Sequence, residues 1–468
     1  MPRGWCPFGA RPWPSTGRRR DEGEGRRPAM GAAAFLKDRL AQHLVRRAPL
    51  FYRRFRDVVR RAHAMPLAER RALRDELTVR TLAKALGTPY ARGMGLGTDY
   101  SAWPLLNKTV LARDPAVCLT PALFPSLAAS TGGTTGIPIK LRRTLASVVF
   151  EQVVLDDLAQ RHAGIDLKRA RIAVLRGDVI KCPDDMRAPH WRLAQGGSQL
   201  VCSSHHLNAS TVDGFIAAIR DFDPDMLWVY PSSLDMLVRL GAPALKTRPF
   251  RRLKLVLASS EVLDEGVFAE AADTLGVPVI DYYGQGERVC ASYAVRPGEH
   301  FFLPAYGRVE LVHAYDDGPW SLHEIVGTSF WNAAQPLVRF RTGDLARLPQ
   351  GLGPEAVEAI TLGVAPFRGV EGRNSEYILS PEGRSLFVLS QIPRNVPDVA
   401  QMQIVQREPS RVEIHVVPRE GFCEASRSVL IANARRKIPA SMGIDIVLVE
   451  RVMRTRAGKS PLVMRLFD

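Results

Sequence analysis

From residue 171 onward, short apolar runs alternate with segments in which apolar residues recur at helical spacing. The apolar runs predict buried strands at 171–175, 226–230, 253–257 and 277–281. The intervening segments predict helices at 212–222, 232–240 and 264–275. Ser232 is expected to cap the second helix and Gly276 to close the third. Strands separated by helices of this length imply parallel crossovers, which predicts an α/β layered sheet with helices on both faces.

The pattern changes in the last third of the chain. Between residues 293 and 348 it becomes short alternating strands and turns, with alternation at 308–313 and turn residues at 316–319, which predicts a β-rich subdomain. A strand at 411–417, a helix at 424–437 and a strand at 444–449 predict a small C-terminal α+β domain. The expected division is a disordered basic leader at 1–29, a large domain with layered, mostly parallel sheets at 30–370, and a small domain at 371–468.

Length and composition fit this multidomain reading. The chain has 468 residues, of which 46% are hydrophobic, enough for a sizeable core in more than one domain. No apolar run reaches 18 residues and the N-terminus is charged and Pro-rich, so neither a spanning helix nor a secretory signal is evident. The six cysteines form no C-x-x-C pair, which favours reduced thiols and a cytoplasmic location.

The net charge of +16 attracts polyanions in principle, but its distribution argues against a nucleic-acid partner. Seven arginines and three acids fall within residues 1–29, which reads as a disordered leader ahead of Met30. Arginine pairs then recur among apolar residues at helical spacing across 35–74. A solvated helical face explains them most simply, and contact with an acidic lipid, nucleic-acid or carrier surface is the alternative.

The segment 130–138 is a loop rich in glycine and hydroxyl residues. Glycines let backbone N–H groups converge on an anion, and the Ser and Thr hydroxyls add uncharged donors, so the loop suits a triphosphate. It is not a Walker loop, because Ile137 and Pro138 follow Gly136 where that motif requires a lysine. A flexible linker would share the composition.

Two further polar segments follow predicted strands. Ser259, Ser260 and Glu261 come after one strand, and Tyr283 and Gly284 come after the next. Since open parallel sheets bind ligands at the carboxyl ends of their strands, both segments are expected to line one crevice.

Together with three later segments, these motifs resemble a known family. In order along the chain, 130–138, 281–287, 339–345, 371–373 and 454–459 resemble the core motifs of AMP-forming adenylate enzymes, the acyl-CoA synthetase superfamily. The likeness is closest to the phenylacetate-CoA ligase branch and its capsular-polysaccharide CapK-like relatives, and it covers roughly residues 50 to 468. It implies a small C-terminal domain that moves relative to the large one during the reaction.

The resemblance assigns a role to each motif. Tyr283 and Gly284 would contact adenine beside the wall formed by Ser259, Ser260 and Glu261. Asp344 would accept the two ribose hydroxyls, Glu287 would ligate Mg²⁺, Arg373 would mark the hinge, and Lys459 would be catalytic. The phosphate-binding residues would be Ser130, Thr131, Gly132, Gly133, Thr134, Thr135 and Gly136.

Several positions depart from the family pattern. Gly132 stands where a serine is frequent, and Ile139 stands where a lysine is frequent, with Lys140 one place later. Gly286 replaces a usual Thr or Ser before the metal-binding glutamate, which predicts either a water in place of the hydroxyl or a slower adenylation. Ser375 and Glu376 differ from the usual hinge residues.

The expected reaction joins a carboxylic acid to AMP from Mg-ATP and then transfers the acyl group, with CoA as the expected thiol. Two alternatives stay open: AMP transfer to a non-carboxylate acceptor, as in coenzyme F390 synthetase, and a non-catalytic nucleotide-binding scaffold in polysaccharide biosynthesis. The acid pocket is expected near Trp228, Tyr230 and 203–207, with an aryl or medium-sized acid preferred. His190, His205 and His206 lack carboxylates or cysteines at ligand spacing, so structural roles are expected for them.

Overall fold

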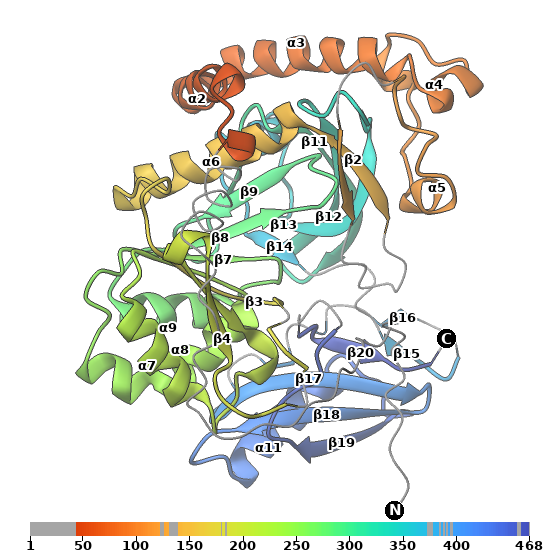
Figure 1. Cartoon of the computed structure of the whole chain (residues 1–468). Coiled ribbons are helices and arrows are strands. Elements are labelled where there is room, and N and C mark those ends of the chain that lie inside the picture. Colours follow the sequence, from red (N-terminus) through yellow and green to blue (C-terminus); the bar gives the residue numbers. More distant parts are fainter. Residues whose placement is uncertain are drawn as a thin grey trace, which may run out of the picture.

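The computed structural model of the chain is a mixed α/β structure built from several sheets (Figure 1). It describes residues 44–121, 126–130, 139–178, 180–182, 185–371, 378–382, 385–386, 389, 392–393, 396–455 and 460–467. Within these ranges, no helix combines the length and the apolar character needed to cross a membrane.

The largest sheet has eight strands, and its centre is parallel. Strand order across the sheet is β10 (His300–Phe302), β9 (Ala291–Ala294), β8 (Val279–Gly284), β7 (Leu255–Ser259), β6 (Met226–Val229), β3 (Ile172–Arg176), β5 (Gln199–Ser203) and β4 (Trp191–Ala194). The neighbours from β5 to β8 pair in parallel, as the alternation of strands and helices predicts. Antiparallel strands, which the sequence analysis did not predict, flank this parallel centre on both sides.

Helices cover both faces of this sheet, because successive side chains of each buried strand point to opposite faces. Ala173 and Leu175 of β3 pack in a core with α7 (Val212–Phe222), α8 (Pro231–Thr247) and α9 (Glu265–Leu275). Ile172 and Val174 pack in a second core with α6 (Leu145–Ala163) and α2 (Pro49–Ala64). Burial on both faces of the sheet therefore explains why the sequences of its central strands are almost continuously apolar.

The helix boundaries correct one prediction and confirm another. Helix α8 begins at Pro231 rather than at a serine cap, because proline has no N–H to satisfy and its fixed φ suits the first turn. The N–H of Ser232 instead donates to the carboxylate of Glu261, at 2.9 Å. In α9, Asp264 caps the N-terminus through its side chain and Gly276 ends the helix in the left-handed conformation, with φ +65°.

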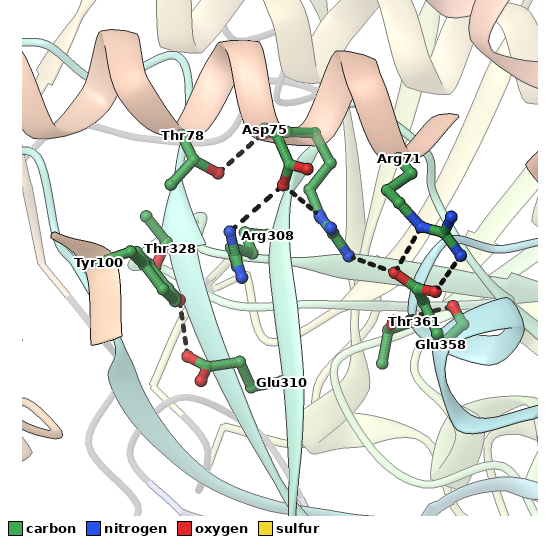
Figure 2. Close-up of polar contacts among 10 residues, drawn as sticks. Arg71, Asp75, Thr78, Tyr100, Arg308, Glu310, Thr328, Glu358 and Thr361 are labelled. Carbon is green, nitrogen blue, oxygen red and sulfur yellow. Dashed lines mark hydrogen bonds and ion pairs between the residues drawn. The ribbon is translucent and has the colours of Figure 1, made fainter. Parts of the chain in front are cut away.

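A four-stranded antiparallel sheet confirms the predicted β-rich region. It contains β11 (Gly307–Asp317), β12 (Trp320–Ser329), β13 (Phe340–Pro349) and β14 (Gly369–Glu371), and the short helix α10 (Pro354–Thr361) lies after β13. Polar contacts attach α3 (Leu67–Ala85) to this region: Arg71 pairs with Glu358 of α10, and Arg308 of β11 pairs with Asp75 (Figure 2).

Some arginines of the basic N-terminal helices lie on a solvated helical face, as the sequence predicts. In α2, Phe55 and Val59 are buried in the core shared with α6. Another set of arginines instead makes internal contacts: Arg47 pairs with Asp156, and Arg70 donates to the carbonyl groups of Leu362 and Gly363. The exposed arginines of α2 are Arg53, Arg54, Arg60 and Arg61.

The C-terminal sheet has two more strands than the sequence predicts. Its order is β19 (Gly443–Leu448), β18 (Arg411–Pro418), β17 (Val399–Glu408) and β20 (Val463–Arg465), with α11 (Glu424–Arg435) packed against it. Strand β17 contacts α8, so this sheet lies directly beside the helices of the large sheet (Figure 1). Short elements complete the described chain: α4 (Pro89–Gly93), η1 (Tyr100–Ala102), α5 (Lys108–Arg113), β1 (Ser126–Ser130), β2 (Lys140–Thr144), η2 (Gln195–Gly197), η3 (Ser204–His206), β15 (Ile378–Leu379) and β16 (Ser385–Leu386).

Candidate functional site

The ends of the glycine-rich loop are held by a two-stranded antiparallel pair. Strands β1 and β2 pair antiparallel, and Ser130 is opposite Lys140 at the end of the pair where β1 ends and β2 begins. The two ends of the segment predicted to bind phosphate are therefore close together. The predicted residues Thr131, Gly132, Gly133, Thr134, Thr135 and Gly136 lie outside the described residues.

The predicted adenine and ribose residues are in direct contact. Tyr283 near the end of β8 donates its phenol hydrogen to Asp344 Oδ2 of β13, at 2.9 Å. Burial, and then the Asp344 carboxylate, raise the pKa of Tyr283 well above its usual range, so the phenol stays protonated and donates. Thr342 shapes the turn before Asp344, because its hydroxyl accepts the Asp344 N–H and donates to Ile325 O.

The segment after β7 is held in an uncommon backbone conformation. Ser259 is buried and accepts a hydrogen bond from Trp228 Nε1 at 3.0 Å. Ser260 has φ +77°, a region that a residue with a side chain seldom occupies unless its surroundings enforce it. Arg176 donates to Ser260 Oγ at 3.2 Å, which helps to fix this conformation.

Glu261 joins this segment to two other parts of the chain. One carboxylate oxygen accepts the N–H of Ser232 at the start of α8, and the other accepts the N–H of Ser460 at 2.8 Å. Arg454 lies near Glu261, whose charge partly opposes the lowering of the Arg454 pKa by burial. Arg454 and Ser460 are described residues on either side of the predicted catalytic lysine. Their interactions with Glu261 place them near the carboxyl end of β7. Lys459 and Arg373 themselves lie outside the described residues.

Glu287, the predicted metal ligand, is buried at 7% exposure, beyond the end of β8. Among the described residues, no group of three or more His, Cys, Asp or Glu side chains could hold a metal ion. One carboxylate fits Mg²⁺ only if phosphate oxygens and water complete the octahedron, which is how Mg²⁺ commonly binds with nucleotides.

A network of arginines and tyrosines contacts the 281–287 motif and its neighbours, and sequence reasoning did not find it. Arg143 of β2 donates to the carbonyl oxygen of Gly286, and Arg288 donates to Ser147 O at 2.6 Å. Glu151 of α6 accepts hydrogen bonds from the phenols of Tyr282 and Tyr306. Arg143, Glu151, Arg288 and Tyr306 lie outside the motifs, and only the topology brings them to Tyr282 and Gly286 of the 281–287 motif, so the sequence offered no signal for these contacts.

The histidines form a packed cluster. The rings of His190 and His206 stack with centroids 4.8 Å apart, and His206 Nδ1 is 2.8 Å from Ser203 Oγ. Burial lowers the pKa of both histidines, which favours their neutral forms. This arrangement agrees with the structural role expected for them.

Comparisons with known proteins show that the chain is similar to CapK and to phenylacetate-CoA ligases. Residues 378–465 match the family model described as the CapK C-terminal domain. The chain is 20% identical to Protein CapK of Staphylococcus aureus over 76% of this chain and 78% of that protein. It is 24% identical to a phenylacetate-coenzyme A ligase of Pseudomonas putida over 53% of this chain, but this covers only 58% of the ligase.

A solved structure shares the fold. The postadenylation-state structure of 2-hydroxyisobutyryl-CoA ligase in complex with 2-HIB-AMP superposes with a TM-score of 0.56 at 14% identity. The superposition covers 86% of this chain and 90% of that one. At this identity the likeness establishes the fold alone.

Proposed function

We propose that the chain activates a carboxylic acid with ATP, a function that its similarity to CapK and to phenylacetate-CoA ligases supports. In the first step, a carboxylate oxygen of the acid attacks the α-phosphorus of ATP, and pyrophosphate leaves to give the acyl-AMP. In the second, a thiol, which we take to be that of CoA, attacks the acyl carbon and AMP leaves, giving the thioester.

The observation that carries this proposal is the contact between Tyr283 and Asp344. One side chain is flat and apolar with a polar tip, and the other presents two acceptor oxygens. A purine needs a stacking surface, and a vicinal diol needs two acceptors a short distance away. The pair meets both needs beside the carboxyl ends of parallel strands, where open α/β sheets bind nucleotides.

The remaining roles follow from charge. The loop between β1 and β2 would hold the triphosphate through backbone N–H groups, and Glu287 would hold Mg²⁺ against it. Mg²⁺ would neutralise charge on the leaving pyrophosphate. Lys459 would offset repulsion between the acid and the α-phosphate, and the Ser460–Glu261 hydrogen bond supports a position for this lysine near the crevice.

The test is pyrophosphate release by the purified protein with Mg-ATP and a panel of aryl and aliphatic acids, with and without CoA. We expect release that depends on an acid, and a thioester only when CoA is added. Lys459→Ala is expected to abolish acyl-AMP formation while sparing thioester formation from supplied acyl-AMP. Equal loss of both half-reactions would contradict the assigned role of Lys459.

Other outcomes of the same assay would support the alternatives. AMP transfer without any acid would favour a non-carboxylate acceptor. Nucleotide binding without turnover would favour a scaffold, a reading that Gly286 supports because this position lacks the hydroxyl expected beside Glu287. A protein that ignores ATP in the presence of Mg²⁺ would exclude all three functions.

A further inference from the structure

Arg176 has an arrangement that its hydrogen bond to Ser260 does not fully explain. It is the last residue of β3, at the carboxyl edge of the main sheet, with β6 and β7 between it and β8. Its guanidinium carbon lies 4.8 Å from the ring centroid of Trp228 and 5.4 Å from that of Tyr230. The two aromatic rings come from the end of β6 and hold the cation against their faces by cation–π attraction.

Arg176 is half-buried, so part of its side chain is accessible to a ligand. A guanidinium has five N–H donors, and the side chain donates to the neutral hydroxyl Ser260 Oγ. Within the described ranges, no Asp or Glu forms an ion pair with it. Glu261, which follows Ser260, accepts the N–H groups of Ser232 and Ser460 with its two oxygens.

Arg171, at the opposite end of the same strand, shows what a structural arginine looks like here. Its guanidinium lies 4.3 Å from the ring of Phe222, and both Nε and a terminal nitrogen donate to Phe222 O. Both cation–π contact and hydrogen bonding therefore serve the packing of α7 at that end. At the carboxyl end, Arg176 has similar aromatic support, but among the described residues only one of its nitrogens donates, to Ser260 Oγ.

A planar cationic fork supported by aromatic rings suits a carboxylate, which accepts two parallel N–H bonds. We propose that Arg176 binds a carboxylate group of the acid substrate, with Trp228 and Tyr230 holding the guanidinium in place. This inference rests on the proposed function. It adds to that function a residue that binds the carboxylate of the acid substrate.

The carboxylate has two possible sources in the substrate. It is either the reacting group or a second carboxylate at the far end of a diacid. Strands in a sheet are about 4.8 Å apart, so β3 lies about 14 Å across the sheet from β8 and its Tyr283. Arg176 therefore lies on the far side of Ser260 from Tyr283, and the proposal places the substrate acid on this side of the predicted adenine wall.

The experiment compares Arg176→Gln, Arg176→Lys and the wild type in acid-dependent pyrophosphate release, with matched pairs such as benzoate with terephthalate and butyrate with succinate. We expect Arg176→Gln to raise the KM for the acid about 10- to 100-fold, the range for losing one charge-assisted hydrogen-bonded contact. The KM for ATP should rise less than the KM for the acid, because Arg176 also donates to Ser260 of the predicted adenine wall. Arg176→Lys keeps the charge without the fork and should recover part of the loss.

The two possible sources of the carboxylate predict different patterns of change in the KM for monoacids and diacids. Equal losses for monoacids and diacids identify the reacting carboxylate, whereas a loss confined to diacids identifies a second carboxylate. Arg171→Gln is the matched control, since it removes a cation–π arginine from the same strand and should leave the KM for the acid unchanged even if it lowers stability.

Two results would overturn the proposal. A rise in the KM for ATP with an unchanged KM for the acid would make Arg176 a nucleotide contact, and unchanged kinetics would make it a structural residue. Calorimetric binding of benzoate and succinate without ATP keeps the test independent of turnover. If no acid supports pyrophosphate release, the proposed function fails, while weaker carboxylate binding by Arg176→Gln would still support the site.

Discussion

At the scale of single residues, the site depends on hydrogen bonds that link positions far apart in the sequence. Tyr283 and Asp344 are separated by 61 residues, yet their side chains meet at 2.9 Å. Asp344 is 8% exposed, so its carboxylate is held in place rather than moving freely in solvent. A fixed acceptor loses little entropy when it binds a diol, which is the advantage of preorganisation.

Asp344→Asn should therefore weaken nucleotide binding. The amide keeps one acceptor oxygen and presents two donors in place of the other, so one of the two ribose hydrogen bonds is lost. We expect the KM for ATP in pyrophosphate release to rise about tenfold or more, with a smaller effect on the KM for the acid. Tyr283→Phe is the matched control for the contact itself, because it deletes only the phenol oxygen, keeps the stacking ring and leaves both oxygens of Asp344 in place. An Asp344→Asn variant with wild-type ATP dependence would exclude the ribose role.

At the scale of elements, Glu261 connects three segments that carry the predicted chemistry. Its carboxylate bonds the first turn of α8 and the backbone just before β20, and it follows β7 itself. A carboxylate accepts at both oxygens, so both N–H groups are satisfied by one side chain.

Glu261→Gln should disturb this connection selectively. The carboxamide accepts at one oxygen only, and its NH₂ group would face the second N–H donor. If the connection positions the Lys459 segment, acyl-AMP formation should fall about tenfold, while thioester formation from supplied acyl-AMP changes less than about threefold. Glu265→Gln, at the start of α9 and paired with Arg368, is the matched control and should preserve both steps. An equal fall in the two half-reactions would show that Glu261 does not act through that segment.

The elements also show why the sequence predicts some strands and misses others. The parallel strands β3, β6 and β7 are near-continuous apolar runs, so periodicity alone identifies them. Strand β17 was missed because glutamines interrupt its apolar pattern. Gln403 and Gln406 are buried there, and their amides donate to backbone carbonyl groups, Gln403 to Met453 O and Pro461 O, and Gln406 to Leu379 O. Such partners depend on tertiary structure, as does the Tyr283–Asp344 contact, so local sequence could not reveal them.

At the scale of the whole molecule, charged residues link the helices of the large sheet to the C-terminal sheet. Arg239 of α8 lies against Asp235 one turn earlier and donates to Val399 O of β17 at 2.6 Å. Arg419, just after β18, pairs with Glu270 of α9 at 3.3 Å. The two arginines and two acids therefore form one cluster across the contact between the sheets.

This cluster predicts how stability depends on pH. Burial, opposed by Arg239, raises the pKa of Asp235 from 3.8 to about 7, and Glu270 adds to the rise. A carboxyl whose folded pKa is raised holds its proton in the folded state after the unfolded chain has lost it. Its contribution to stability is therefore complete below about pH 4 and is lost as the pH rises to about 7.

Asp235→Asn keeps the shape of the side chain without titrating, so it should flatten the fall in Tm between pH 5 and pH 7.5 by roughly a few degrees relative to the wild type. Asp273→Asn, on exposed α9 surface, is the matched control and should keep the wild-type slope. A steeper or unchanged fall in Asp235→Asn would mean that the ionised carboxylate is needed between the two arginines and that the cluster favours contact between the sheets at high pH.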